Sequence, residues 1–261
     1  MLDLLVFCTK DLAPPLAHIQ QLERYRQYWF VTITPYGPEI EPYVPPKEQV
    51  LERLKCLSKV VGPSAVAWRY DPILLNETYT EKHYLEEFER MAAALCGYTE
   101  VCVISFVDLY EKVKRNFPAL QPVSRERRIA LGRAFLSIAD RYGMVLKTCA
   151  EGDELAPYGV DCSGCMTTEV FEKELGIHLD PLKGPRARCA CACSLGGDIG
   201  QYDTCGHMCR YCYTNRGPEI VLKNRELHDP SSPFLIGGAL PGDRIRSARQ
   251  ESWLDLQMRM E

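Results

Sequence analysis

The sequence lacks any long apolar run. No stretch approaches the roughly 20 apolar residues that a membrane-spanning helix needs, so we expect no membrane partner. The chain begins Met-Leu-Asp-Leu-Leu-Val-Phe, a short apolar run with no positively charged residue before it. A secretory signal peptide has a positive start and a longer apolar core. These absences predict a cytoplasmic protein.

The sequence also lacks an excess of positive charge. Its 31 Lys and Arg residues and 35 Asp and Glu residues give a formal net charge of −4 at pH 7. A surface that wraps nucleic acid needs a strongly basic balance, so nucleic acid is not an expected partner. The 261 residues are 46% hydrophobic, which is enough for one large core. An α/β barrel of this length can be a single domain.

Cysteine, in contrast, is plentiful and clustered. The chain has 13 cysteines, and nine of them lie between Cys149 and Cys212. The four that come earlier stand within apolar patterns, as buried core residues do. The cytosol keeps thiols reduced, so clustering of this kind favours metal binding over disulfides.

Three of these cysteines form a motif with the spacing C-x3-C-x2-C, at Cys205, Cys209 and Cys212. Three thiolates can hold three irons of a cubane cluster, which leaves the fourth iron open to an added ligand. Tyr211 comes directly before the third cysteine. In spacing and in this aromatic the stretch resembles the signature of radical S-adenosylmethionine (SAM) enzymes. The resemblance implies that SAM binds the open iron and that Tyr211 packs on its adenine.

Zinc is the alternative metal for this motif. The three cysteines could be three ligands of a structural zinc ion, with His207 or another cysteine as the fourth. His207 lies inside the first loop of the motif and would have to double back to reach the same ion. Zinc sites also prefer paired C-x2-C or C-x2-H arms, and only one arm here has that form. The pattern therefore favours an iron–sulfur cluster over zinc.

The first 150 residues alternate between strand and helix patterns. Short apolar runs predict buried parallel strands at Leu4–Cys8, Trp29–Thr34, Ala65–Trp68, Val101–Phe106 and Met144–Thr148. Helical spacing predicts helices over Glu48–Val61 and Thr80–Leu95, and from Ser124 to just before Gly143. A sixth strand, Asp198–Asp203, is predicted to lead into the cysteine motif. This order predicts an α/β fold of right-handed βαβ units in a parallel sheet or barrel.

Polar residues stand at or just after the end of each of the first five predicted strands. They are Lys10, Thr34, Arg69 with Asp71, Ser105 with Asp108, and Lys147 with Glu151. Active sites of parallel barrels form at the carboxyl ends of the strands, so these side chains and Cys205 should meet at one end. Arg69, Asp71 and Glu151 are candidate contacts to a cofactor or substrate. A buried structural ion pair is the alternative for Arg69 and Asp71.

Several segments together resemble one known family. They are Trp68-Arg-Tyr-Asp-Pro-Ile73, Tyr98–Phe106, Thr148-Cys-Ala-Glu151, the Cys205–Cys212 motif and the tail Lys223–Pro233. In these segments the chain resembles the family called domain of unknown function 1848, over nearly its whole length. The resemblance implies a radical-SAM-like, TIM-type parallel β/α barrel whose cluster cysteines lie near the C-terminus. Such a barrel is circularly permuted, because ordinary radical SAM enzymes carry these cysteines after the first strand.

The resemblance also implies three regions. Residues 1–182 form the β/α barrel portion, residues 183–215 form a cysteine-rich iron–sulfur segment that completes the barrel, and residues 216–261 form a tail. Members of the family begin with a further strand before the one matched by Leu4–Cys8. Either this chain starts at an internal methionine, or the barrel is partial, without its first βα unit and with an open edge beside Leu4–Cys8.

A second cysteine group suggests a second metal site. Cys191 and Cys193 resemble the C-x-C pair of the family, and Cys149 and Cys165 match its single cysteines. Four thiolates would saturate an auxiliary 4Fe–4S cluster. Zinc in the same four-thiolate cage is the alternative, although C-x2-C arms are more usual for zinc.

These observations predict a radical SAM enzyme that binds one 4Fe–4S cluster, or two, together with SAM. It would cleave SAM reductively to a 5′-deoxyadenosyl radical, which abstracts hydrogen from a substrate that the sequence does not identify. An electron donor such as flavodoxin or ferredoxin is the expected protein partner. The alternatives are a noncatalytic iron–sulfur protein for electron transfer or sensing, and a zinc-stabilised binding module.

Overall fold

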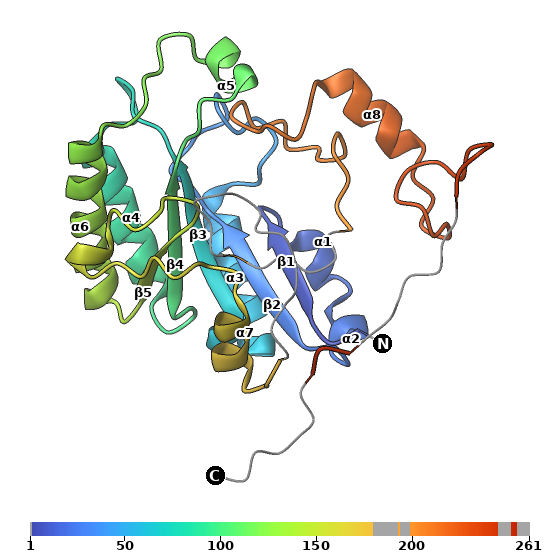
Figure 1. Cartoon of the computed structure of the whole chain (residues 1–261), viewed down its shortest axis with the longest axis horizontal. Coiled ribbons are helices and arrows are strands. Elements are labelled where there is room, and N and C mark those ends of the chain that lie inside the picture. Colours follow the sequence, from blue (N-terminus) through green and yellow to red (C-terminus); the bar gives the residue numbers. More distant parts are fainter. Residues whose placement is uncertain (1, 180–192, 194–198, 245–251, 255–261) are drawn as a thin grey trace.

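A parallel β-sheet is the centre of the molecule. The computed structural model describes residues 2–179, 193, 199–244 and 252–254. Its five strands lie in chain order and are all parallel. They are β1 (Leu5–Thr9), β2 (Gln27–Thr32), β3 (Val66–Ile73), β4 (Val101–Phe106) and β5 (Val145–Thr148) (Figure 1). The predicted α/β fold with five parallel strands is confirmed, and within the described ranges no strand joins β5 back to β1.

Three long helices confirm the helical predictions to within a few residues. They are α3 (Lys47–Val61), α4 (Glu81–Leu95) and α6 (Arg125–Arg141). The shorter ones are α1 (Ala13–Leu16), α2 (Ile19–Leu22), α5 (Glu111–Asn116), α7 (Thr168–Leu175) and α8 (Pro218–Glu226), with 3-10 turns at Pro63–Ala65 and Ala156–Tyr158. None of the helices in the described part of the chain is long and apolar enough to cross a membrane.

The ends of the long helices follow from their sequence. The hydroxyl of Thr80 accepts a hydrogen bond from the backbone N–H of His83 at 3.3 Å, and this bond caps the start of α4. Ser124 caps α6 in the same way. Helix α3 ends at Gly62, whose φ of 91° is costly for any residue with a Cβ.

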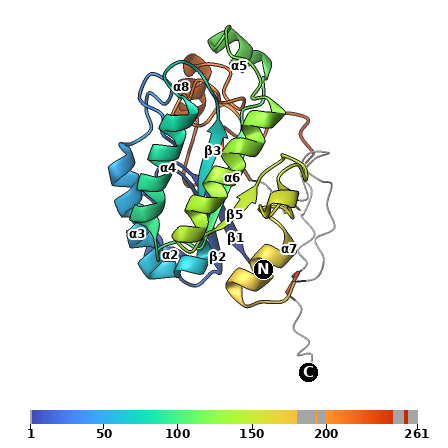
Figure 2. The same ribbon diagram turned by 90° about the vertical axis from the view of Figure 1, so that its left-hand side faces the viewer.

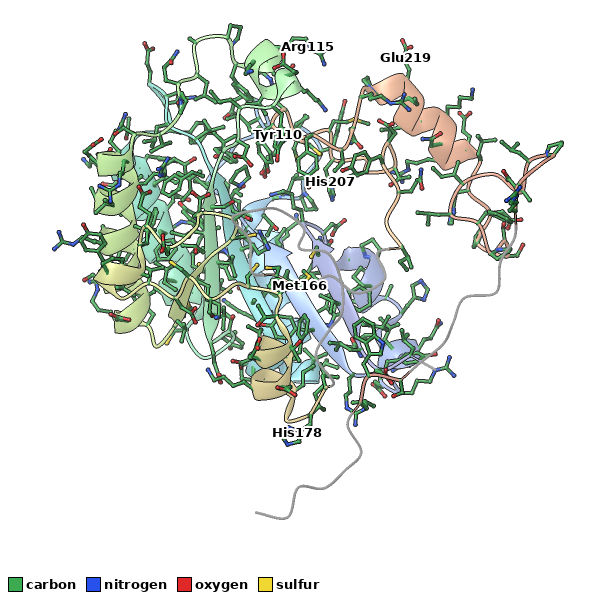
Figure 3. The ribbon with its side chains drawn as sticks, viewed as in Figure 1. Tyr110, Arg115, Met166, His178, His207 and Glu219 are labelled. Carbon is green, nitrogen blue, oxygen red and sulfur yellow. The ribbon has the colours of Figure 1, made fainter. Side chains whose placement is uncertain are left out.

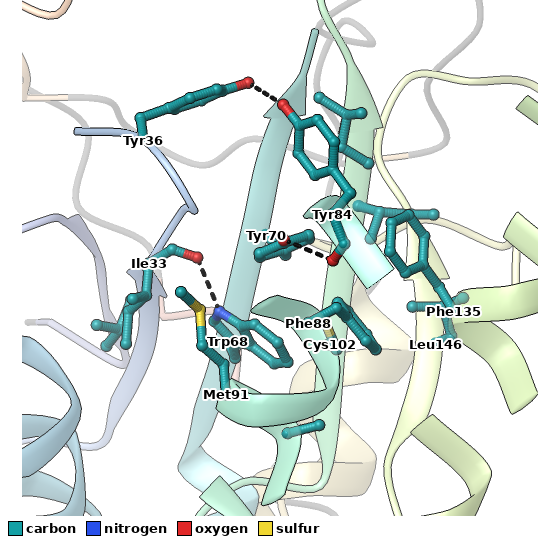
Figure 4. Packing of buried hydrophobic residues seen from close by; sticks show 14 of the residues in the cluster. Ile33, Tyr36, Trp68, Tyr70, Tyr84, Phe88, Met91, Cys102, Phe135 and Leu146 are labelled. Atoms are coloured by element: carbon teal, nitrogen blue, oxygen red, sulfur yellow. Dashed lines mark hydrogen bonds between the residues drawn. The ribbon is translucent and has the colours of Figure 1, made fainter. Parts of the chain in front are cut away.

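One face of the sheet packs against α3, α4 and α6, which lie side by side in Figure 2. The centre of this core is a set of fully buried aromatic rings from β3, α4 and α6 (Figure 4): Trp68, Tyr70, Tyr84, Phe88 and Phe135. The polar atoms of these rings are satisfied, because the Trp68 indole N–H donates to the carbonyl of Ile33 at 3.0 Å. Burial of these rings supplies much of the apolar driving force for this half of the fold.

The other face of the sheet is covered by α7 and by loops that carry cysteines. Phe30 and Val103 point from the strands into this second core, where they meet Phe171 of α7 and the side chain of Cys165. Towards the carboxyl ends of the strands this face becomes polar. Arg69 of β3 lies over the ring of Phe30, with 5.6 Å between the guanidinium carbon and the ring centroid.

The predicted sixth strand is wrong. Asp198 lies outside the described residues, and Ile199–Asp203 forms turns and irregular chain. Asp203 has a φ of 60°, outside the extended region, and its N–H donates to the carbonyl of Thr214 at 3.1 Å. The chain thus turns back on itself at this point. Residues 199–215 contribute no strand to the sheet, and most of residues 183–198 lie outside the described ranges.

Candidate functional site

A cavity of about 540 Å³ opens at the carboxyl ends of the strands. Six of the seven cysteines predicted as metal ligands line it: Cys149, Cys165, Cys193, Cys205, Cys209 and Cys212. The seventh, Cys191, lies outside the described residues. The four predicted cofactor-binding residues line it as well: Arg69, Asp71, Glu151 and Tyr211. The fold therefore brings together residues that are up to 143 positions apart in the chain.

Four of the six residues predicted to meet at one end of the sheet line this cavity, and Thr34 and Lys147 do not. Lys10, Arg69, Ser105 and Cys205 all line it. Thr34 is absent from the cavity wall but bonds to a carboxylate beside it, and the Nζ of Lys147 donates to Asp161 Oδ2 at 2.6 Å. Figure 3 labels His207 and Met166, two further residues of the cavity wall, which come from the two cysteine-bearing loops.

The Cys205–Cys212 loop is tied to the loop that follows β2. The backbone N–H of Arg210 donates to the carbonyl of Ile40 at 2.9 Å. The N–H of Tyr43 donates to the carbonyl of His207 at 3.3 Å, and the His207 Nδ1 lies 3.0 Å from the carbonyl oxygen of Tyr43. This contact involves only Nδ1 of His207, so the alternative of His207 Nε2 as a fourth zinc ligand stays open.

The three thiols of this loop differ in exposure. Cys205 is exposed, Cys212 is half-buried, and Cys209 is buried. Burial raises the pKa of the Cys209 thiol to about 12, although the nearby Lys10 ammonium acts in the opposite direction. Met208, directly before Cys209, has a φ of 54°, a conformation that costs a non-glycine residue energy and that is common at functional sites. The loop is held in a shape that its sequence does not favour locally.

Tyr211 is anchored by a buried carboxylate. Its hydroxyl donates a short hydrogen bond to Oε1 of Glu41. The same oxygen accepts from Lys10 Nζ at 3.0 Å and from the hydroxyl of Thr34 at 2.8 Å. The ring of Tyr211 packs on Tyr36, and only 9% of the residue is exposed. Little of this ring therefore faces the cavity, and its contact with adenine stays a prediction.

Glu41 is the functional-site residue that the sequence reasoning missed. It stands in a proline-rich loop after β2, where no periodic pattern marks a residue as buried. Its exposure is only 6%. A charged residue that is this deeply buried needs partners, and Glu41 has three of them.

Arg69 and Asp71 form the buried ion pair that the sequence raised as an alternative. The Nε of Arg69 lies 3.1 Å from each carboxylate oxygen of Asp71, and its Nη2 makes a further short bond to Oδ2. The hydroxyl of Ser105 donates to the same carboxylate at 3.3 Å. The pair also forms part of the cavity wall, so an ion pair and a contact to a bound molecule are compatible here.

Three thiols lie together beside this ion pair. The Sγ atoms of Cys165 and Cys193 are 3.6 Å apart. A hydrogen bond from Cys165 lowers the pKa of the Cys149 thiol, against the effect of burial, and the Arg69 guanidinium lowers it further. The pKa of Cys165, which acts as the donor, is raised. Cys149 therefore favours the thiolate form, which is the form that binds metals.

Glu151 and the Arg69–Asp71 ion pair lie on opposite sides of strand β4. One carboxylate oxygen accepts a hydrogen bond from the N–H of Phe106 at 2.8 Å. Burial raises the pKa of Glu151 to about 7 in spite of this bond. Ala150, between Cys149 and Glu151, has a φ of 60°. This segment is the second cysteine-bearing part of the cavity wall with a strained backbone.

The described cysteines fit a thiolate-bound iron–sulfur cluster in donor type. Among the described residues, no three His, Cys, Asp or Glu side chains surround one point closely enough to hold one metal ion. In a cubane each thiolate binds a different iron, so the ligands are spread over a larger body. Thiolate donors with cationic Lys10 and Arg69 nearby match the chemistry of an anionic iron–sulfur cluster.

Together these features define an α/β protein with a cysteine-lined cavity at the carboxyl edge of a parallel sheet. The chain belongs to the family described as domain of unknown function (DUF1848), whose model matches residues 1–214. No curated protein matches this chain in sequence.

Two solved structures are distantly similar. One is a protein described as a fructose-1,6-biphosphate aldolase from Coccidioides immitis, with 12% identity and a TM-score of 0.38 over 67% of this chain and 61% of that one. The other is described as a sugar phosphate isomerase/epimerase from Anabaena variabilis, with 14% identity and a TM-score of 0.38 over 67% of this chain and 70% of that one. This chain thus spans less than two thirds of the first. At these values neither similarity says what this chain binds.

Proposed function

We propose that this chain is a radical SAM enzyme whose 4Fe–4S cluster is held by Cys205, Cys209 and Cys212. The observation that supports this best is the meeting of all three thiols with Arg69 and Glu151 in one cavity, where parallel β/α folds keep their chemistry. A reduced cluster bound there would supply the electron that cleaves SAM into methionine and a 5′-deoxyadenosyl radical. An electron donor such as flavodoxin or ferredoxin would restore that electron.

The charges of the cavity wall suit a zwitterion such as SAM. Lys10 is paired with Glu41, and Arg69 is paired with Asp71, so each cation of the wall has a carboxylate beside it. A ligand with both an ammonium and a carboxylate can exchange partners with such pairs without leaving a buried charge alone. Glu151 adds a further acceptor for an ammonium or hydroxyl group. Arg69, Asp71 and Glu151 are the residues that we assign to SAM or substrate.

The second cysteine group would hold an auxiliary 4Fe–4S cluster. Cys149, Cys165 and Cys193 supply three thiolates, and Cys191 would supply the fourth. The finer architecture belongs to the same proposal: a partial, circularly permuted, TIM-type barrel. The five parallel strands and the position of the cavity support it.

The burial of Tyr211 favours a second candidate, a noncatalytic iron–sulfur protein for electron transfer or sensing. The ring packs on Tyr36 and its hydroxyl is held by Glu41, which leaves little surface for adenine. A protein that only carries electrons needs no adenine contact.

One experiment separates the two candidates. The protein is reconstituted anaerobically with iron and sulfide and reduced, and its electron paramagnetic resonance spectrum is recorded with and without SAM. If the enzyme proposal is correct, SAM changes the spectrum, and a strong chemical reductant then drives slow release of 5′-deoxyadenosine. An unchanged spectrum and no 5′-deoxyadenosine would reject the enzyme and leave the electron carrier. S-adenosylhomocysteine, which has no sulfonium, is the control for cleavage.

A further inference from the structure

The segment that follows the cysteine loop is built into the loop. The family model ends at residue 214, but the next residue, Asn215, is only 2% exposed and its Nδ2 donates to the carbonyl of Cys205 at 2.7 Å. The Nζ of Lys112 on α5 donates to the carbonyl of Asn215. Asn215 thus links the first cysteine of the motif to a helix from the middle of the chain.

Asp203 is a second attachment point. Its carboxylate accepts from the backbone N–H of Arg216 and, at 2.7 Å, from the Nε of the same residue. The Nδ2 of Asn224 on α8 donates to the Asp203 carbonyl at 3.0 Å. Asp203 has the positive φ noted above, so these three bonds hold a conformation that it would not favour alone. The turn that leads into Cys205 is therefore set from outside the motif.

Arg225 covers the loop directly. A Cβ placed on Gly206 would collide with Nη1 of Arg225, so this guanidinium lies against the backbone between Cys205 and His207. A Cβ at this position would push the flexible guanidinium of Arg225 out of this place. The positive charge lies against the residue that follows Cys205, the most exposed cysteine of the motif, where three bound thiolates would add negative charge.

We propose that residues 215–227, the C-terminal clamp, fix the Cys205 end of the cluster site and protect it. Asn215, Arg216 and Arg225 are then positioning residues for the cluster, supplied by a segment beyond the part that the family model matches. In Figure 1 the clamp, which contains α8, lies on the far side of the cysteine loop from the sheet. This inference rests on the proposed cluster but not on SAM cleavage.

The test measures how firmly the cluster is held. Full-length wild-type protein and the variants Asn215→Ala and Arg225→Ala are reconstituted anaerobically, and loss of the visible iron–sulfur absorption is followed after a ferrous chelator is added. We expect Asn215→Ala to lose its cluster about tenfold faster, the factor that one lost hydrogen bond to the loop would give. Arg225→Ala should lose it a few-fold faster, because a positive charge is removed from beside the loop. Thermal unfolding of the apoproteins should change little, because the clamp contacts the loop and not the sheet core.

Matched variants make the result specific. Lys223→Ala removes one positive charge from α8 at an exposed position and should release the cluster at the wild-type rate. Arg225→Lys keeps the positive charge but loses the planar guanidinium contact. Its rate of cluster loss should therefore lie between that of the wild type and that of Arg225→Ala. Gly206→Ala should release the cluster at about the same rate as Arg225→Ala. The double variant should release it little faster than either single variant, because both substitutions break the same contact.

The outcomes distinguish the inference from the function. If both clamp variants and Lys223→Ala release the cluster at the wild-type rate, the clamp is rejected while the cluster stands. If the wild-type protein binds no iron, the proposed function and the clamp are rejected together.

Discussion

Arg69 and Cys165 are 96 positions apart in the sequence, and Nη1 of Arg69 donates a hydrogen bond to Sγ of Cys165 over 3.7 Å. This contact joins β3 to the loop that carries Cys165, one member of the second cysteine group. The same guanidinium neutralises Asp71. One side chain therefore fixes a carboxylate and a thiol in the cavity wall, and its loss should affect both.

The first prediction is that Arg69→Met destabilises the protein by roughly 3 kcal/mol, because it leaves Asp71 buried without its cation. Side-chain exposures of 15% for Arg69 and 11% for Asp71 place the pair largely out of water. Urea unfolding of the apoprotein measures the effect. The double variant Arg69→Met/Asp71→Asn should recover part of the loss, since the lone charge is then gone. Equal stability of the single variant and the wild type would show that the pair is not buried.

The second prediction concerns the anchor of the cysteine loop. Tyr211→Phe removes one donor from the buried Glu41 carboxylate and should cost about 1 kcal/mol. Tyr211→Ala also removes the packing on Tyr36 and should cost about 3 kcal/mol or more. Thermal unfolding checks both. Tyr43→Phe, at a residue that is 69% exposed, is the matched control and should be neutral. A destabilised Tyr43→Phe, or a neutral Tyr211→Ala, would contradict the buried anchor.

The third prediction is a pH dependence that comes from Glu151. Its pKa is raised from 4.5 to about 7 in the folded protein, so between these values the folded state binds more protons than the unfolded state. Stability that is present below pH 4.5 is therefore lost as the pH rises to 7, by up to about 3 kcal/mol. Glu151→Gln keeps the acceptor for Phe106 and should remove this part of the dependence. Urea unfolding of the wild type and of Glu151→Gln at a series of pH values measures this difference. If the free energy of unfolding changes with pH equally in both proteins, the prediction is wrong.

The fourth prediction concerns iron content. Reconstituted wild-type protein should hold roughly eight irons, four for each of two cubanes. Replacing Cys205, Cys209 and Cys212 together with alanine should remove about half of this iron and leave the other cluster in place. Of the four early cysteines that the apolar pattern predicted as core residues, only Cys102 is buried. Cys56 and Cys96 are exposed and do not line the cavity, so their replacement is the control. Stoichiometric zinc without iron in anaerobically purified protein would reject both clusters.

Sequence patterns predicted the strands where the residues are uniformly apolar. Val101–Phe106 is predicted and observed with the same bounds, because nearly every residue of β4 is buried. The pattern ended β3 at Trp68, but the strand continues to Ile73. Arg69 and Asp71 stay in it because they neutralise one another on the second face of the sheet. Hydrophobic spacing cannot reveal two opposite charges that neutralise one another within a strand.

The site was predicted in its residue types but not in its contacts. Cysteine spacing marked the motif, and the parallel strands indicated the end at which the polar residues meet. That Glu41 holds Tyr211, or that Arg225 covers Gly206, depends on chain segments brought together by the whole fold. No local pattern encodes such contacts. Asp198–Asp203 was mistaken for a strand because its turn is fixed by Arg216 and Asn224, beyond the motif.

The contact of Tyr211 with Tyr36 has a consequence for the motions of the cysteine loop. The Tyr36 hydroxyl meets that of Tyr84 at 2.6 Å, and the Tyr84 ring packs on Tyr70 in the aromatic core of Figure 4. The loop is thereby continuous with the packed rings that join the sheet to its helices. It cannot open without separating Tyr211 from them, so hydrogen exchange at the Arg210 amide should be as slow as exchange in the strands.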